Sequence, residues 1–173
     1  MAATKDFRAY SIFDVVRVDA AGKSVGKDVY WKLYAIENTV RVLVHSVLTQ
    51  QIGTNWWHVA VDPKIQAGVK SRQADYASQP WHSTPGKHDV YYVFLSDLGK
   101  IIIANSHLFR PVISDIDNWV MRLEQIRLPR NIIGHMNWLT AIDGKRIDVV
   151  HSDLRLLIHK LTTAGAVLAI PPV

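Results

Sequence analysis

One stretch of the chain, residues 129–138, combines side chains that could act on a phosphate group. Arg130 stands five positions before His135, and Asn131 directly follows the arginine. A histidine exchanges protons near neutral pH, whereas a guanidinium grips a phosphate in two places and stabilises charge that develops on it. Asn131 can orient the imidazole or bond a phosphate oxygen. These residue types suit metal-free RNA cleavage by 2′-OH attack on the neighbouring phosphate, and without a nearby carboxylate cluster we expect neither a metal site nor a cofactor.

A single helix over this stretch would place polar and apolar residues on opposite faces. At about 100° per residue, the apolar arc contains Ile132, Ile133, Met136 and Leu139. The polar arc contains Arg127, Arg130, Asn131, Gly134, His135 and Asn137. Arg130 and His135 diverge by about 140° on this wheel, and Gly134 leaves room for a ligand. The alternative is that the arginine and the histidine only form the solvated face of the helix.

A second polar group lies near the start of the longest helical pattern. Glu37 and Arg41 are four positions apart with the acid first, which is the favourable order for an ion pair on a helix. With Asn38, Tyr34 and His45 they form a polar stripe. This stripe is either a solvated face or one wall of a cleft shared with Arg130, and the sequence leaves both possibilities open.

Composition restricts the class of protein. The chain has 173 residues, of which 49% are hydrophobic and 20% charged, so it can bury a sizeable core. It has no cysteine, which excludes disulfides and thiolate metal sites. The apolar runs are too short to cross a membrane, and no secretory signal is visible at the N-terminus, so we expect a cytoplasmic protein. The net charge of +5 favours anionic partners such as RNA only slightly.

Periodicity predicts a mainly α protein, an up-and-down bundle of four or five helices. We expect an N-terminal extension over residues 1–28, the bundle over 29–162 and an apolar tail over 163–173. In the extension, residues 19–28 predict a turn or loop. From residue 29 a helix is predicted, ended by Gly53, and its apolar stripe consists of Leu33, Ile36, Val40, Leu43, Val44, Val47 and Leu48.

The rest of the bundle is predicted in shorter pieces. A short helix follows Pro63, a loop covers residues 74–89, and a further helix or strand covers 90–109. Ser114–Asp117 resembles a capping box. The helix that follows is expected to turn inward Ile116, Trp119, Val120, Leu123 and Ile126. Pro129 then suits the first turn of a new helix. The last helix, over about 147–161, is expected to turn inward Val149, Val150, Leu154, Leu157, Ile158 and Leu161. The tail could add a strand or cover an edge.

The pattern Arg130-Asn131-x-x-x-His135 resembles the signature of the HEPN superfamily, which is an arginine, a polar residue and a short gap to a histidine. The context is similar to one HEPN branch, in which a helix with an acidic residue and an arginine precedes a Trp-containing turn. Here these correspond to Tyr34-Ala-Ile-Glu37-Asn38-Thr-Val-Arg41 and to Asn55-Trp56-Trp57, and residues 95–102 resemble the middle helix of that branch. The resemblance covers roughly residues 30–160.

The resemblance implies an HEPN-like helical bundle, commonly a homodimer with one composite RNase site between paired signatures. It further implies metal-independent endoribonuclease activity on RNA, often in toxin–antitoxin or antiviral defence systems, with a possible antitoxin or effector partner protein. By position, His135 would be the general acid/base, Arg130 the phosphate clamp and Asn131 the polar residue. The alternatives are a catalytically silent HEPN module that binds RNA or a nucleotide, and a helical dimerisation module.

Overall fold

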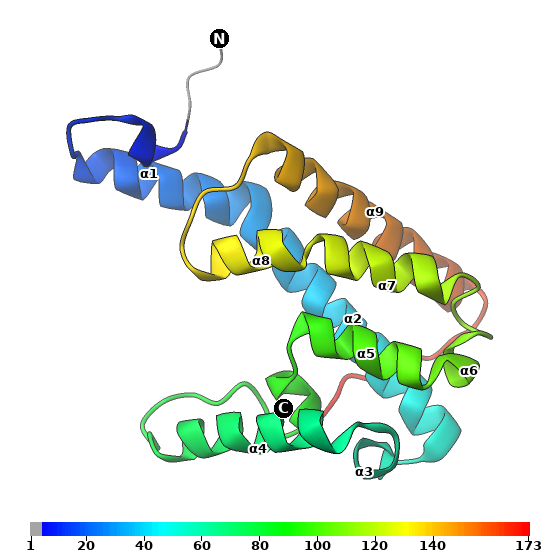
Figure 1. Ribbon diagram of the computed structural model, residues 1–173. Helices are drawn as coiled ribbons and strands as arrows, with labels where there is room; N and C mark the ends of the chain where they lie inside the picture. Colours follow the sequence, from blue (N-terminus) through cyan, green and yellow to red (C-terminus); the bar gives the residue numbers. More distant parts are fainter. Residues whose placement is uncertain (1–4) are drawn as a thin grey trace.

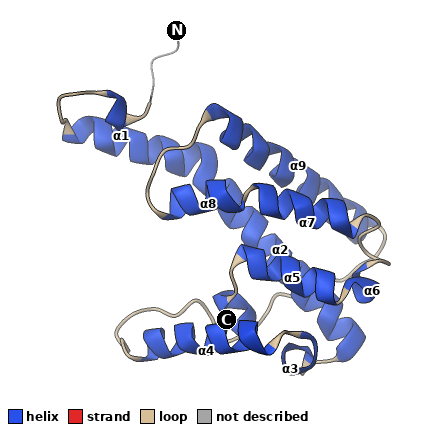
Figure 2. Ribbon diagram, in the orientation of Figure 1, coloured by secondary structure: helices blue, strands red, loops and turns tan. Residues whose placement is uncertain are grey.

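The computed structural model describes residues 5–173, and this part of the chain is helical without any strand (Figure 2). The first four residues of the predicted extension lie outside the described residues. The helices are α1 (Val15–Val25), α2 (Trp31–Ile52), α3 (Trp56–Ala60), α4 (Pro63–Ala77), α5 (Leu95–Ala104), α6 (Ser106–Phe109), α7 (Ile116–Gln125), α8 (Arg127–Gly134) and α9 (Ala141–Thr163). Short 3-10 turns form η1 (Phe7–Ala9) and η3 (Asp89–Tyr92). The prediction of a mainly α protein is confirmed, and a helical bundle is consistent with it, but the described residues form more helices than the four or five predicted. Within the described range, no helix has the length and apolar character needed to cross a membrane.

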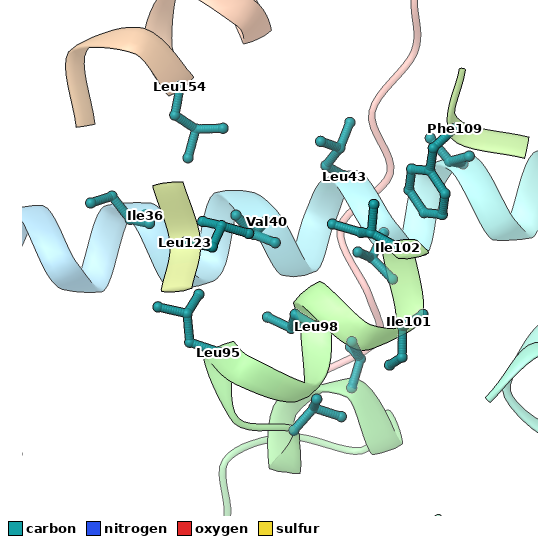
Figure 3. Packing of buried hydrophobic residues seen from close by; sticks show 14 of the residues in the cluster. Ile36, Val40, Leu43, Leu95, Leu98, Ile101, Ile102, Phe109, Leu123 and Leu154 are labelled. Carbon is teal, nitrogen blue, oxygen red and sulfur yellow. The ribbon is translucent and has the colours of Figure 1, made fainter. Parts of the chain in front are cut away.

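Helix α2 is the central element of the bundle. Figure 1 shows it crossing the molecule diagonally, and it contacts α5 and α9 directly. All seven residues of the predicted apolar stripe are buried, so that prediction is confirmed. Figure 3 shows Ile36, Val40 and Leu43 of this stripe beside Leu95, Leu98, Ile101 and Ile102 of α5, with Phe109, Leu123 and Leu154 contributed by α6, α7 and α9. Gly53 ends α2 with φ of 104°, a left-handed conformation that favours glycine.

The turn predicted over residues 19–28 is wrong, because this segment is helical. Helix α1 continues through a π-helical turn, η2 (Gly26–Tyr30), directly into α2. Asp14 caps the N-terminus of α1 by accepting from the Val16 amide at 3.0 Å, and the Ser24 hydroxyl donates to Asp28 one turn further on at 2.8 Å. These local bonds and the burial of Ala21 offset the cost of about 1 kcal/mol that each helical glycine carries. The predicted boundary at residue 28 therefore falls inside a helical turn.

The predicted element over residues 90–109 is divided by the side chain of Asn105. Its amide donates at 2.9 Å both to the Ile101 carbonyl and to the Ala60 carbonyl of α3, so α5 stops and the short α6 begins. Asparagine favours such breaks because its side chain competes with the backbone for hydrogen bonds. At the next helix the predicted capping box does not form, because the N-cap is Asp115 and not Ser114: Asp115 accepts from the Asn118 amide at 3.1 Å.

The last helix is longer than predicted, and its inward face is narrower than predicted. Thr140 caps it by accepting from the Asp143 amide at 3.2 Å, so α9 starts at Ala141 rather than near Ile147. Val150 and Leu154 are buried as expected, but Val149 is 56% exposed. The inward placement of Val149 is therefore wrong. A neighbouring position lies about 100° away on the wheel, and the inward face of α9 is too narrow to include it.

The tail over residues 163–173 packs along α2 and η3 without forming a strand. The Ala169 amide donates to the Ser46 hydroxyl at 2.8 Å, and Gln50 donates to the Val167 carbonyl at 2.8 Å. Further on, the Tyr91 hydroxyl donates to the Pro171 carbonyl at 2.7 Å. In Figure 1 the tail passes behind α5 and ends near α4. These bonds satisfy backbone groups of the extended tail, which no strand pairs.

A cluster of aromatic and histidine rings joins the C-terminal half of α2 to η3. The Trp56 indole donates to Nδ1 of His45 at 3.3 Å, and the His88 ring stacks on Trp56 with 5.3 Å between ring centroids. His88 also accepts from the Val90 amide and donates its own amide to the Pro172 carbonyl. Burial lowers the pKa of His45, and burial with the nearby His45 lowers the pKa of His88. His45 therefore belongs to the core and not to the predicted polar stripe.

Shortening a buried side chain of the core should leave a cavity and lower the free energy of unfolding. Leu98 of α5 is fully buried in the cluster of Figure 3, so Leu98→Ala should lower the free energy of unfolding by about 2–5 kcal/mol. Ile103→Ala in the same helix removes an exposed side chain and should change it by less than about 0.5 kcal/mol. Urea denaturation of both variants measures the difference, and equal losses would contradict this packing.

The histidine cluster predicts an acid-sensitive fold. Both histidines have lowered pKa values when folded, so the unfolded chain binds more protons once the pH falls below about 6.5. The free energy of unfolding should be constant above that pH and should decrease as the pH falls from 6.5 to 5. Urea midpoints measured along this series should fall less steeply for His88→Gln. The loop variant His82→Gln, at an exposed position, should keep the full slope, and an unchanged slope in His88→Gln would refute the assignment.

Candidate functional site

The segment that carries Arg130 and His135 is helical only in its first part. Helix α8 ends at Gly134, and Met136 has φ of 57°. The Met136 amide donates to the Ile133 carbonyl and the Asn137 amide to the Ile132 carbonyl, both at 2.9 Å. This pair of bonds is the Schellman arrangement, which usually has glycine at the left-handed position. The predicted helix running on to Leu139 is therefore wrong, because the backbone reverses at Met136.

The reversal changes which residues face the core. Ile133 and Leu139 are buried, as the wheel predicts, but Met136 is 88% exposed. The inward placement of Met136 is wrong because a left-handed residue leaves the helical path on which the wheel depends. His135 occupies the C-terminal end of α8 and is exposed. The exposed histidine therefore sits at a tight corner between α8 and α9.

A cleft of about 1100 Å³ lies between α1, α2 and α8, and four of the predicted site residues line it. Glu37, Asn38 and Arg41 come from α2, and Arg130 comes from α8. The Arg130 Nε donates to Glu37 Oε2 at 3.3 Å, across 93 positions of sequence. The second oxygen of Glu37 pairs with Arg41. The sequence left open whether the polar stripe is a solvated face or a cleft wall. In the structure, Glu37, Asn38 and Arg41 of this stripe line the same cleft as Arg130.

Asn131 and His135 are placed differently. Neither residue is among the described residues that line the cleft, whereas Gly134, which lies between them in the sequence, does line it. Asn131 is half-buried and His135 exposed. A Cβ built on Gly134 would lie 3.8 Å from Nη1 of Arg130, an ordinary contact. The structure therefore puts the arginine and the histidine on different sides of the end of α8, as their divergence on the wheel predicts.

Two arginines share one carboxylate in this cleft. The side chains of Glu37 and Arg41 are both 12% exposed, whereas that of Arg130 is 33% exposed. Arg41 also donates to Asn38 Oδ1 at 3.2 Å and to the Val93 carbonyl at 3.1 Å, while its buried Nε has no partner among the described residues. The three charges sum to one positive charge. Arg130 uses only Nε in the bonds described, which leaves its outer nitrogens available to an anion.

Aromatic residues also line the cleft, and the sequence pointed to only one of them, Tyr34 of the polar stripe. Tyr91 of η3 and Trp138 of the α8–α9 corner line the cleft, together with Phe7 of η1 and Tyr34 of α2. Burial raises the pKa of Tyr91. Arg8 of η1 donates to Asn137 Oδ1 at 3.1 Å and so ties the N-terminal turn to the corner. No local sequence pattern marks the other aromatic residues, because they meet only through the packing of distant segments.

This geometry suits the binding of an anion with an attached apolar or aromatic group. The positive charge lies at the arginine cluster, and the aromatic rings flank it. A phosphate that approached Arg130 would meet two free guanidinium nitrogens, with the unpaired Nε of Arg41 deeper in the wall. Arg130, which was predicted to hold a phosphate, lines this cleft. His135, which was predicted to transfer a proton, is not among the described residues that line it.

The shared carboxylate predicts a test of the arginine cluster. Glu37→Gln should lower the free energy of unfolding by about 2 kcal/mol, because two guanidiniums would then face each other around a neutral amide. The matched control is Glu124→Gln, since Glu124 is exposed and pairs with Arg127 on the surface. That change should cost less than about 1 kcal/mol. Thermal or urea denaturation compares the two, and equal costs would show that Glu37 does not hold the cluster together.

Comparisons of the chain with models of protein families, with curated proteins and with solved structures found no match. A role for the cleft therefore depends on its own residues and on the sequence resemblance of the α8 segment.

Proposed function

We propose that this chain is a metal-independent endoribonuclease of the HEPN type. The observation that supports this most is the placement of Arg130 at the mouth of a positively charged cleft, with His135 exposed five positions further along. Arg130 would hold the scissile phosphate through its free nitrogens, and His135 would move the proton. Asn131, half-buried between them along the helix, would bond a phosphate oxygen or orient the imidazole.

The reaction uses the substrate's own 2′-OH as nucleophile. One His135 imidazole takes the proton of the 2′-OH, the 2′ oxygen bonds to phosphorus, and the bond from phosphorus to the 5′ oxygen breaks. The leaving 5′ oxygen receives a proton from a second His135 that starts as the protonated imidazolium and ends neutral, so charge and protons balance. Arg130 stabilises the negative charge that gathers on the phosphate oxygens. The products are a 2′,3′-cyclic phosphate and a 5′-OH.

A homodimer would supply the second imidazole. In one chain, Arg130 and His135 are separated by about 7.5 Å along the helix axis and by about 140° around it, so they do not face one phosphate from the same side. Exposed apolar side chains lie on both sides of this corner, Met136 in the turn and Ile142 at the start of α9, and Leu128 is exposed at the other end of α8. A second copy meeting these residues would bury them and would bring two arginines and two histidines around one phosphate. A toxin or antiviral effector of this kind would be held inactive by an antitoxin or another partner protein.

One observation favours a second candidate function, a catalytically silent module that binds RNA or a nucleotide or only dimerises. Arg130 already pairs with Glu37, and His135 is not among the described residues that line the cleft. In this alternative, the arginine cluster binds phosphate without cleavage, and the α8–α9 corner serves assembly alone. The two functions differ in whether RNA is cut, which is directly measurable.

The test is RNA cleavage in the presence of EDTA. Purified protein should cut structured or single-stranded RNA and leave 2′,3′-cyclic phosphate ends. Arg130→Ala and His135→Ala should each lower the rate at least about 100-fold, as expected for the loss of a charge-stabilising or proton-transfer group. Gel electrophoresis and end-group analysis of the fragments give the rate and the chemistry.

Matched controls separate a site effect from a folding effect. Arg127→Ala removes an arginine of the same helix that pairs with Glu124, and His82→Ala removes an exposed loop histidine; both should retain full activity. RNA that is bound without cleavage would support the silent module. A protein that dimerises without binding or cutting RNA would support the dimerisation module.

A further inference from the structure

A second recess lies between α2 and α9, with no lining residue in common with the cleft. Its volume is about 500 Å³, and Trp31 of α2 and His151, Arg155 and His159 of α9 contribute to its walls. We call it the α2–α9 groove. The three α9 residues follow one another at four-residue spacing, so they lie on successive turns of one face.

The residues that line the groove carry a net positive charge. Among the described residues that line it, none is acidic. Arg155 is exposed and has no carboxylate partner within residues 5–173. Lys32, next to Trp31 in sequence, adds a cation 5.6 Å from the centroid of the Trp31 ring, although it also pairs with Asp148. An anion in the groove would therefore meet a free guanidinium without opposing charge on the lining.

His151 gives a second and independent indication of a ligand. It is only 8% exposed, it lines the groove, and its ring nitrogens have no hydrogen-bond partner in the described part of the chain. Its ring meets the Trp31 ring edge-on, with centroids 4.9 Å apart. Burial, helped by Arg155 and Lys32 and opposed by Asp148, lowers its pKa and so favours the neutral ring, which can donate one bond and accept another.

Trp31 supplies an aromatic surface at the same place. It is 45% exposed, although tryptophan usually buries most of its ring. Nucleobases stack on exposed aromatic rings, and phosphates bind arginine and histidine. A volume of about 500 Å³ falls within the range of sites for small molecules and single nucleotides. The groove thus combines an aromatic platform, an unpaired arginine and a partly buried histidine without a partner.

We propose that the α2–α9 groove binds one nucleotide unit, with the base against Trp31 and the phosphate held by Arg155 and His159. His151 would bond the base or the sugar. The unit is either a free nucleotide or one residue of an RNA strand, since both present the same base and phosphate. The proposal does not depend on cleavage at Arg130, because the two sites have separate linings.

The experiment follows the Trp31 indole N–H signal of the full chain by NMR, assigned with Trp31→Phe, during titration with adenosine 5′-monophosphate. The nucleotide should shift this signal in a saturable way. Arg155→Gln should weaken binding about tenfold or more, as the loss of a charge-assisted hydrogen bond predicts. Lys160→Gln removes the same charge from a nearby exposed position of α9 that does not line the groove, and it should leave binding unchanged.

Further arms identify the ligand. Inorganic phosphate and adenosine should each bind more weakly than the nucleotide. A 2′-O-methyl hexanucleotide, which cannot be cleaved by 2′-OH attack, competes with the nucleotide if the natural ligand is a strand and fails to compete if it is a free nucleotide. The proposal is overturned if the nucleotide leaves the Trp31 signal unmoved, if phosphate alone binds as tightly as the nucleotide, or if Arg155→Gln and Lys160→Gln weaken binding equally. His135→Ala should leave this titration unchanged, so a failure of RNA cleavage and a failure of this proposal are distinguishable.

Discussion

The burial of one face of α2 is the interaction on which the rest of the structure depends. Seven apolar residues of this helix are covered by α5, α7, α9 and the aromatic cluster at its C-terminal half. Burial of an aliphatic side chain contributes about 1.5–3 kcal/mol, so this stripe fixes how the later helices approach α2. The polar stripe on the same helix then faces α8. For that reason Arg130 meets Glu37, 93 positions earlier in the chain.

Placing α8 against the polar stripe of α2 has an electrostatic consequence. A carboxylate as buried as Glu37 requires compensation, and it has two arginines, one mostly buried and one at the surface. The outer arginine is the group that an incoming phosphate would reach first. Glu37 therefore limits the charge of the cleft to one net positive charge and fixes the orientation of Arg130. The same packing that stabilises the bundle thus sets the properties of the cleft.

The backbone reversal at Met136 decides where the histidine lies. A residue other than glycine at a left-handed position costs about 1 kcal/mol, and here the Schellman bonds and the burial of Leu139 offset that cost. His135 consequently stands at an exposed corner instead of on a continuing helix. The corner also presents Met136 and Ile142 to solvent. If a second copy packs on this corner, both proposals for the chain, cleavage and assembly, involve the same surface.

Local signals in the sequence determined much of this protein. The apolar spacing on α2 and the glycine that ends it each act within a few residues, so pattern alone identifies them. The same kind of pattern located the start of α7 to within one residue, at Ser114 instead of the capping Asp115. The glycines and aspartates at positions 19–28 led to a wrong prediction of a turn. These residues favour a turn only where capping and packing do not stabilise a helix. The helical wheel correctly predicted that Arg130 and His135 point in different directions. It wrongly predicted that Met136 faces the core, because periodicity does not detect the left-handed residue that ends the helix.

Only the tertiary structure decided which distant residues share a site. The pairing of Arg130 with Glu37, the aromatic walls from η1, η3 and the α8–α9 corner, and the groove between Trp31 and His151 all join segments far apart in the chain. Residue types and spacing by themselves indicated most of the helices, the residues that suit phosphate chemistry and the resemblance to HEPN proteins. The docking of those helices determined the cleft and the groove, because the energy of packing depends on contacts that no local pattern encodes.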